Sequence, residues 1–90
     1  MKWDSANMET DHFKTASEFK ECIIRGGEPV FAWKGTVYGV CFSEVGYCIA
    51  HADGSFEQIC RTPDDVLEYM AGDDRLRDVI TQVTVLNRTI

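Results

Sequence analysis

Residues 30–51 read VFAWKGTVYGVCFSEVGYCIAH, and this stretch decides the fold class of the chain. β-Branched and aromatic residues dominate it and fall into three runs, at residues 30–33, 36–42 and 47–51. Such runs, separated by turn residues, are typical of β-strands. The stretch therefore predicts three consecutive strands.

The sequences between these runs are those of tight turns. Lys34-Gly35 fits a hairpin turn, residues 43–46 fit a four-residue loop, and Asp53-Gly54 is the strongest hairpin signal in the chain. Residues 55–61 follow as a fourth run with weaker alternation of apolar and polar side chains. We therefore predict an antiparallel meander sheet of three or four strands.

Helical patterns flank the sheet on both sides. Before it, Thr15 and Glu18 form a capping-box pattern, and Gly26-Gly27 ends an apolar stripe at helical spacing made of Ala16, Phe19, Cys22 and Ile23. After it, Thr62-Pro63 is a helix start, and the helix is predicted to run to about Ala71 and end at Gly72.

The C-terminal segment is less regular. Asp73-Asp74 can cap another helical turn that reaches Ile80, and residues 81–86 fit either helix or strand. The predicted fold is α+β, with an N-terminal helix, the meander sheet and C-terminal helices packed on one face of it. Residues 13–90 are expected to form one domain, preceded by a flexible lead-in at residues 1–12 that has no apolar periodicity.

Composition and charge exclude several classes of protein. The chain is 44% hydrophobic, which is too apolar for a disordered chain, and it lacks an 18-residue apolar run for a membrane helix. Its formal charge of -6 repels phosphate backbones and anionic membranes, so direct nucleic-acid and membrane binding are not expected. The N-terminus shows no signal-peptide pattern, and we expect a cytoplasmic protein.

Four cysteines, Cys22, Cys41, Cys48 and Cys60, lie among apolar residues. We expect all four to be buried and reduced. Their spacing contains no Cys-x-x-Cys pair, so no metal site is predicted. A disulfide between Cys41 and Cys48 is geometrically possible if the hairpin places them opposite each other.

Patterns for catalysis are weak. His51 is the one histidine inside a predicted element, and it could pair with Cys41, Cys48 or Cys60 in a small enzyme, which is the third and most distant hypothesis. The glycines form no phosphate-binding pattern, so no cofactor is expected. The sequence favours a protein that is not an enzyme.

Acidic and aromatic residues supply a different hypothesis. Six acids within 15 residues could form a negative patch on the C-terminal helices, and the sheet has more aromatic side chains than a thin core needs. The patch could dock on a basic surface of a protein partner. The candidate partner-binding residues are Asp64, Asp65, Glu68, Asp73, Asp74, Asp78, Trp33 and Tyr38.

The layout of residues 13–86 resembles a loose class of small acidic proteins. The helical stretch at residues 13–19, the short aromatic strands, and the stretches at residues 61–69 and 76–80 look like the helix-sheet-helix orphan proteins of bacterial phages and mobile elements, some of which are anti-CRISPR proteins. The resemblance implies an inhibitor that works in the bacterial cytoplasm. It would block a host protein, such as a CRISPR nuclease, by occupying a basic nucleic-acid-binding surface.

The alternative hypothesis is a structural or regulatory subunit that self-associates through its sheet. A monomer would favour the inhibitor, and a homodimer would favour the subunit.

Overall fold

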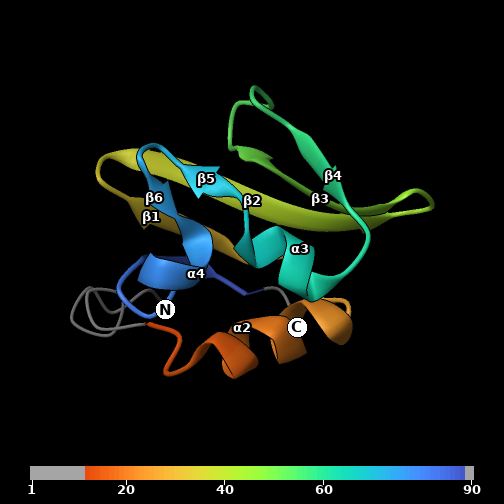
Figure 1. Cartoon of the computed structure of the whole chain (residues 1–90), viewed down its shortest axis with the longest axis horizontal. Coiled ribbons are helices and arrows are strands. Elements are labelled where there is room, and N and C mark those ends of the chain that lie inside the picture. The colour runs from red at the N-terminus through yellow and green to blue at the C-terminus, as the bar shows by residue number, and fades with distance from the viewer. Residues whose placement is uncertain (1–11, 89–90) are drawn as a thin grey trace, which may run out of the picture.

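The computed structural model describes residues 12–88, which contain one large antiparallel sheet and three helices. The strands lie in the order β4-β3-β2-β1-β7, and Figure 1 shows the helices on the same side of this sheet. The predicted mixture of helices with an antiparallel sheet is confirmed. The large sheet consists of β1 (Val30–Trp33), β2 (Thr36–Ser43), β3 (Gly46–His51), β4 (Gln58–Cys60) and β7 (Thr84–Asn87), and the helices are α2 (Ala16–Ile24), α3 (Pro63–Leu67) and α4 (Leu76–Val79).

Helix α2 begins with hydrogen bonds like those of a capping box, except that Glu18 reaches the residue before the N-cap, Lys14, instead of Thr15 itself. The Thr15 hydroxyl accepts the Glu18 backbone N–H at 3.0 Å, and the Glu18 carboxylate accepts the Lys14 N–H at 2.5 Å. These contacts pair backbone donors that have no partner inside the helix. The helix ends before Gly26, whose φ of +90° is readily adopted by glycine alone.

The turn between β1 and β2 fixes the register of the sheet. Lys34 and Gly35 both have positive φ, 49° and 83°, as a type I′ turn requires. Trp33 therefore pairs with Thr36, and Phe31 pairs with Tyr38. Because side chains alternate across a strand, Phe31 and Tyr38 point to the same face.

The C-terminal third differs from the sequence prediction. Helix α3 ends at Leu67 instead of Ala71, and a small hairpin of β5 (Met70–Ala71) and β6 (Asp74–Arg75) turns at Gly72, where φ is +69°. Asp73-Asp74 does not cap α4, since its N-cap is Arg75 and makes no side-chain cap hydrogen bond. Residues 84–87, left open as helix or strand, form β7 and pair with β1.

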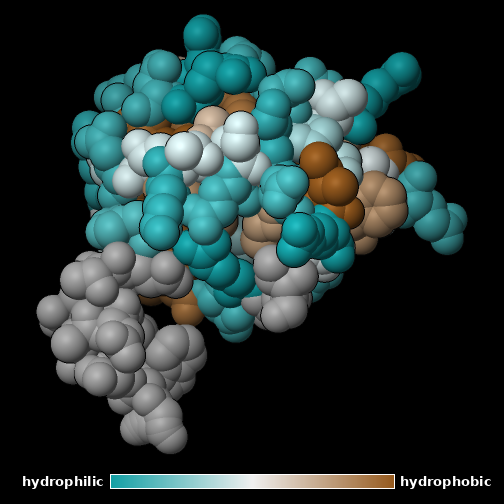
Figure 2. All heavy atoms as spheres, turned by 90° about the horizontal axis from the view of Figure 1, so that it is seen from below, coloured by the Kyte–Doolittle hydropathy of each residue, from teal (hydrophilic) through white to brown (hydrophobic). Residues whose placement is uncertain are grey.

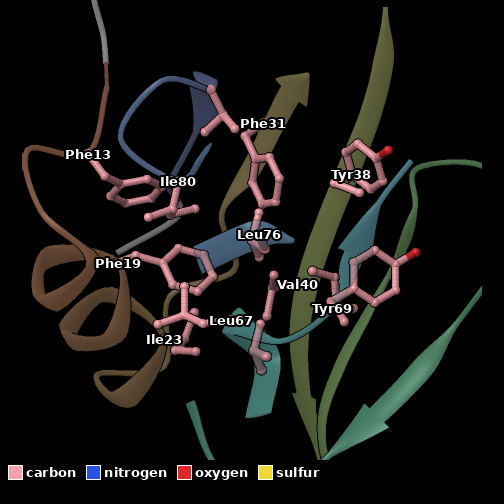
Figure 3. Packing of buried hydrophobic residues seen from close by; sticks show 14 of the residues in the cluster. Phe13, Phe19, Ile23, Phe31, Tyr38, Val40, Leu67, Tyr69, Leu76 and Ile80 are labelled. Carbon is pink, nitrogen blue, oxygen red and sulfur yellow. The ribbon is translucent and has the colours of Figure 1, made fainter. Parts of the chain in front are cut away.

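One hydrophobic cluster fills the space between the sheet and the helices (Figure 3). Aromatic rings run through it in succession: Phe13 contacts Phe19 edge to face at 5.3 Å, Phe19 contacts Phe31 at 6.3 Å, and Phe31 stacks on Tyr38 at 5.7 Å. Tyr69 then contacts Tyr38 at 6.1 Å. Because these rings come from α2 and the residues before it, from β1 and β2, and from the segment after α3, the cluster joins both helical parts of the chain to the sheet.

The predicted flexible lead-in mostly lies outside the described residues, since residues 1–11 are not among them. His12, its last member, is held in place. Nδ1 of His12 lies 3.0 Å from the Val83 carbonyl oxygen, and the Arg88 guanidinium donates to the His12 carbonyl oxygen at 3.0 Å. His12 is therefore attached to the C-terminal part of the described chain by two contacts.

Candidate functional site

Half of the predicted acidic patch is neutralised by basic side chains. The Asp64 carboxylate lies 3.1 Å from Lys20 Nζ and 3.8 Å from the Arg77 guanidinium. The Glu68 carboxylate lies 2.9 Å from Arg77 and 3.3 Å from Arg75. These contacts tie α2, α3 and α4 together at the surface. Asp64 and Glu68 are therefore engaged within the fold.

Asp74 is also engaged, and its partners are the last residue of β1 and the first residue of the turn that follows it. Lys34 Nζ and the Trp33 indole N–H both lie 3.0 Å from the Asp74 carboxylate. The hydrogen bond from Lys34 and then that from Trp33 hold the pKa of Asp74 below its ordinary value. These two contacts bring one predicted aromatic residue together with the acidic patch. Among residues 12–88, the patch members Asp65, Asp73 and Asp78 form no ion pair and are exposed.

The two aromatic residues predicted to bind a partner are less accessible than expected. Tyr38 is only 2% exposed, because its strand turns it toward the helices, where it packs between Phe31 and Tyr69. It cannot contact a partner in this conformation, so the expectation of an exposed Tyr38 is wrong. Trp33 is half-buried against the core, with Lys34 Nζ 5.4 Å from its ring centre.

The loop between β3 and β4 presents an aromatic side chain that the sequence did not single out. Phe56 is 74% exposed and has a φ of +56°. A bulky side chain in this left-handed region is strained, and such strain concentrates at functional sites. We call residues 52–57 the Phe56 loop. The Asp53-Gly54 turn was visible in the sequence, but the exposure of Phe56 depends on a φ that no local pattern predicts.

The Phe56 loop is held by a network of contacts. Asp53 accepts hydrogen bonds from the Ser55 backbone N–H at 2.9 Å and from the Ser55 hydroxyl at 2.6 Å. These hydrogen bonds lower the pKa of Asp53, with the His51 side chain adding a smaller effect. The buried Tyr69 donates its hydroxyl to the Phe56 carbonyl at 3.0 Å, and the Phe56 ring lies 4.7 Å from the His51 ring. The loop therefore presents Phe56 in a fixed position.

Other large apolar side chains are exposed in different parts of the fold. Figure 2 shows a largely hydrophilic face with a group of hydrophobic atoms near its right-hand edge. Phe42, near the end of β2, is 61% exposed but rests edge to face on Tyr47 at 5.0 Å. In the part of the chain that the structure describes, the other exposed large apolar residues are Ile24, Phe42, Val45, Ile59 and Met70. None of these five residues has a positive φ.

The hypothetical pairing of His51 with a cysteine finds no support in the strand geometry. His51 pairs with Tyr38 on the helix-facing side of the sheet, whereas Cys41 and Cys48 pair with each other on the opposite side. Cys60 pairs with Tyr47, four residues along β3 from His51, which is about 13 Å at 3.3 Å per residue. The His51 ring instead contacts Tyr38 and Phe56.

The cysteines are free, and three of the four are buried. Cys41 is exposed, so the prediction that all four are buried is wrong at this position. It lies on the face of the sheet away from the helices. Burial is the main factor that raises the pKa of the Cys22 and Cys60 thiols.

No family model matches the chain, and no curated protein or solved structure is significantly similar to it. Within residues 12–88, no three histidine, cysteine or acidic side chains gather in a way that could hold a metal ion. The helices of that same region are too short or too polar to cross a membrane.

Proposed function

We propose that this protein is a small protein-binding module that acts stoichiometrically, with Phe56 as the side chain that anchors its partner. The observation that carries the proposal is the strained, exposed and firmly held conformation of Phe56. Buried aromatic anchors dominate the energetics of protein interfaces. A loop already fixed in its binding conformation loses little entropy when it binds. Phe56 has both properties.

The charges around the anchor favour a basic partner. Asp53 and Glu57 lie close to Phe56 in the loop and are exposed, and both carry negative charge at neutral pH. Asp65, Asp73 and Asp78 add negative charge that no ion pair within residues 12–88 neutralises. A surface of this kind steers toward positive charge and away from nucleic acid. The partner is therefore a protein whose apolar pocket has a basic rim.

The resemblance to small phage and mobile-element proteins extends the proposal. In this extended form, the chain inhibits a host protein of the bacterial cytoplasm, such as a CRISPR nuclease, by occupying its basic nucleic-acid-binding surface. Binding to such a surface would be competitive with DNA or RNA. No catalytic step is part of the proposed action.

The test is a comparison of immobilised variants against bacterial lysate. The wild-type protein, Phe56→Ala and the matched control Phe42→Ala are compared, because Phe42 is also an exposed aromatic but has an ordinary backbone. We expect a protein to be retained by the wild type and by Phe42→Ala, to be lost with Phe56→Ala, and to be released by added double-stranded DNA. Equal retention by all three variants would contradict the role of Phe56. Retention that DNA does not affect would contradict the basic-groove part of the proposal.

The acidic residues are tested separately. Asp65, Asp73 and Asp78 form no ion pair within the described residues, so their change to Asn should leave the fold intact while flattening the salt dependence of partner binding. The control is Asp64→Asn with Glu68→Gln, which breaks the ion pairs among α2, α3 and α4. An unchanged salt dependence in the triple variant would show that these acids do not steer binding.

Self-association remains the second candidate function, because the helices cover only one face of the sheet (Figure 1). The opposite face carries mostly small side chains, among them Ala32, Gly39 and Ala50, which would let a second sheet approach closely. The solution mass decides this candidate: a stable dimer at micromolar concentration supports it, and a monomer contradicts it.

A further inference from the structure

Two thiols face each other on the helix-free side of the sheet. Cys41 of β2 and Cys48 of β3 are direct partners in the antiparallel register. Side chains at directly opposed positions project to the same face, with Cβ atoms about 4.5 to 5.5 Å apart. The two thiols therefore project from neighbouring positions on the same face of the sheet.

Their environments differ in a way that suits a stepwise reaction. Cys41 is exposed, whereas Cys48 is 7% exposed and has the Ser43 hydroxyl 3.6 Å from its sulfur. A reagent from solution therefore meets Cys41 first. Cys48, which is less accessible, is then placed opposite Cys41 to attack its sulfur.

A shallow hollow beside Cys41 gives a small molecule room to approach. Its volume is about 340 Å³, and Glu28, Val30, Gly39, Cys41 and His51 are among the residues that line it. Gly39 contributes no side chain to this space, and a Cβ there would come within 4.0 Å of Val30. Because the hollow is open to solvent, a small-molecule disulfide can bring a sulfur atom to Cys41.

We propose that Cys41 and Cys48 form a redox-active pair, which a small-molecule disulfide such as oxidised glutathione converts into an intramolecular disulfide. The Cα separation of an antiparallel pair, about 4.5 to 5.5 Å, lies within the range that a disulfide spans. The other two cysteines have no such partner in the register: Cys22 sits against the Arg88 carbonyl oxygen, and Cys60 sits against the Gln58 side chain.

The reaction is two successive thiol–disulfide exchanges. The Cys41 thiol first releases its proton to solvent, and its sulfur attacks one sulfur of glutathione disulfide. The S–S bond of glutathione disulfide breaks, one glutathione leaves as a thiol, and the other stays bonded to Cys41. Cys48 then loses its proton and attacks the Cys41 sulfur, which releases the second glutathione. Two thiols of the protein are oxidised, and one small disulfide is reduced to two thiols.

The charges around Cys41 set the pH dependence of the first exchange. Burial and the neighbouring Cys48 raise the pKa of Cys41, and the carboxylates of Glu28 and Glu57 add to this effect. Because the thiolate is the attacking form and the pKa of Cys41 is raised above the ordinary thiol value of 9.0, the exchange should be slow at neutral pH and should still be accelerating at pH 9.0.

The experiment treats the reduced full-length protein with oxidised glutathione and follows the products by mass spectrometry. We expect the mass to fall by two hydrogens, and a peptide map should link Cys41 to Cys48. In Cys48→Ser the glutathione adduct on Cys41 should persist, and in Cys41→Ser the pair should not react. Cys22→Ser with Cys60→Ser is the control and should form the same link.

Three results would overturn the proposal. The first is a wild-type adduct on Cys41 that never resolves, which would mean that the sulfurs cannot come within bonding distance. The second is a reaction that begins at Cys22 or Cys60, and the third is an intermolecular disulfide as the main product. The wild-type peptide map decides the question even if a serine variant fails to fold.

Discussion

The left-handed backbone of Phe56 predicts which of two variants at this position, glycine or alanine, is the more stable. In this region a residue with a Cβ costs about 1 to 2 kcal/mol more than glycine. In the unfolded chain, glycine has more conformational freedom, which lowers stability by about 0.4 to 1 kcal/mol relative to alanine. Since φ at position 56 is +56°, the first effect outweighs the second. Phe56→Gly should therefore be more stable than Phe56→Ala by about 0.5 to 1 kcal/mol.

The comparison isolates the backbone because both variants remove the same ring. Each loses the contact between Phe56 and His51, so the difference between the two contains the cost of the φ angle and the unfolded-chain entropy but not the loss of the ring. For a domain of this size, the difference corresponds to about 2 to 8 °C in melting temperature. Urea unfolding followed by tryptophan fluorescence gives the free energies of unfolding directly.

The neighbouring residue supplies the control. Glu57 is exposed and does not have a positive φ, so there the alanine variant should be the more stable one, by about 0.4 to 1 kcal/mol. The reasoning fails if alanine is more stable than glycine at both positions. That result would mean that the loop relaxes to an ordinary conformation once the ring is gone, and that Phe56 is not strained by its surroundings.

Three further predictions concern stability. Leu76→Ala removes a fully buried side chain and should lower the free energy of unfolding by about 2 to 5 kcal/mol; a loss under 1 kcal/mol in urea titration would speak against the described core. Thr62→Ala removes the hydroxyl that accepts the Asp65 N–H at 3.1 Å and should cost about 1 kcal/mol, most of which Thr62→Ser should restore. The depressed pKa of Asp74 stabilises the fold at pH values above its ordinary pKa of 3.8, and this contribution is lost as the pH falls through the lower, folded-state value. Asp74→Asn should remove that part of the acid dependence, and an unchanged pH profile of stability would contradict the contacts with Lys34 and Trp33.

The sequence predicted those parts of the fold that local chemistry determines. Lys34-Gly35 is a turn because both positions require positive φ, and the capping box of α2 contains its own hydrogen-bond partners. Long-range pairing decides the C-terminal segment instead. Residues 84–87 form a strand because they pair with the edge of β1, which lies more than 50 positions earlier in the chain. A sequence pattern read over a few neighbouring residues does not contain this partner. The strands β5 and β6 have two residues each, which is too short for the alternation of apolar and polar residues that marks a strand in the sequence.

The candidate site was predictable only in part. The acids were visible, but Lys20 and Lys34 neutralise Asp64 and Asp74 from segments that are distant in sequence. Tyr38 could have been assigned to the core, because alternation along β2 places it on the same face as Val40. The same alternation places Cys41 on the other face.

The pairing of β7 with β1 has a consequence for the way the chain folds. The first strand of the sheet acquires one of its two neighbours only when residues 84–87 are present. Val83 and Val85, both fully buried, also reach the core from this last stretch. Pairings between segments so far apart form late, since closing the intervening loop costs entropy before any contact repays it. A chain still being synthesised can form α2 and the β2–β3 hairpin, but β1 keeps an open edge until residues 84–87 have been added.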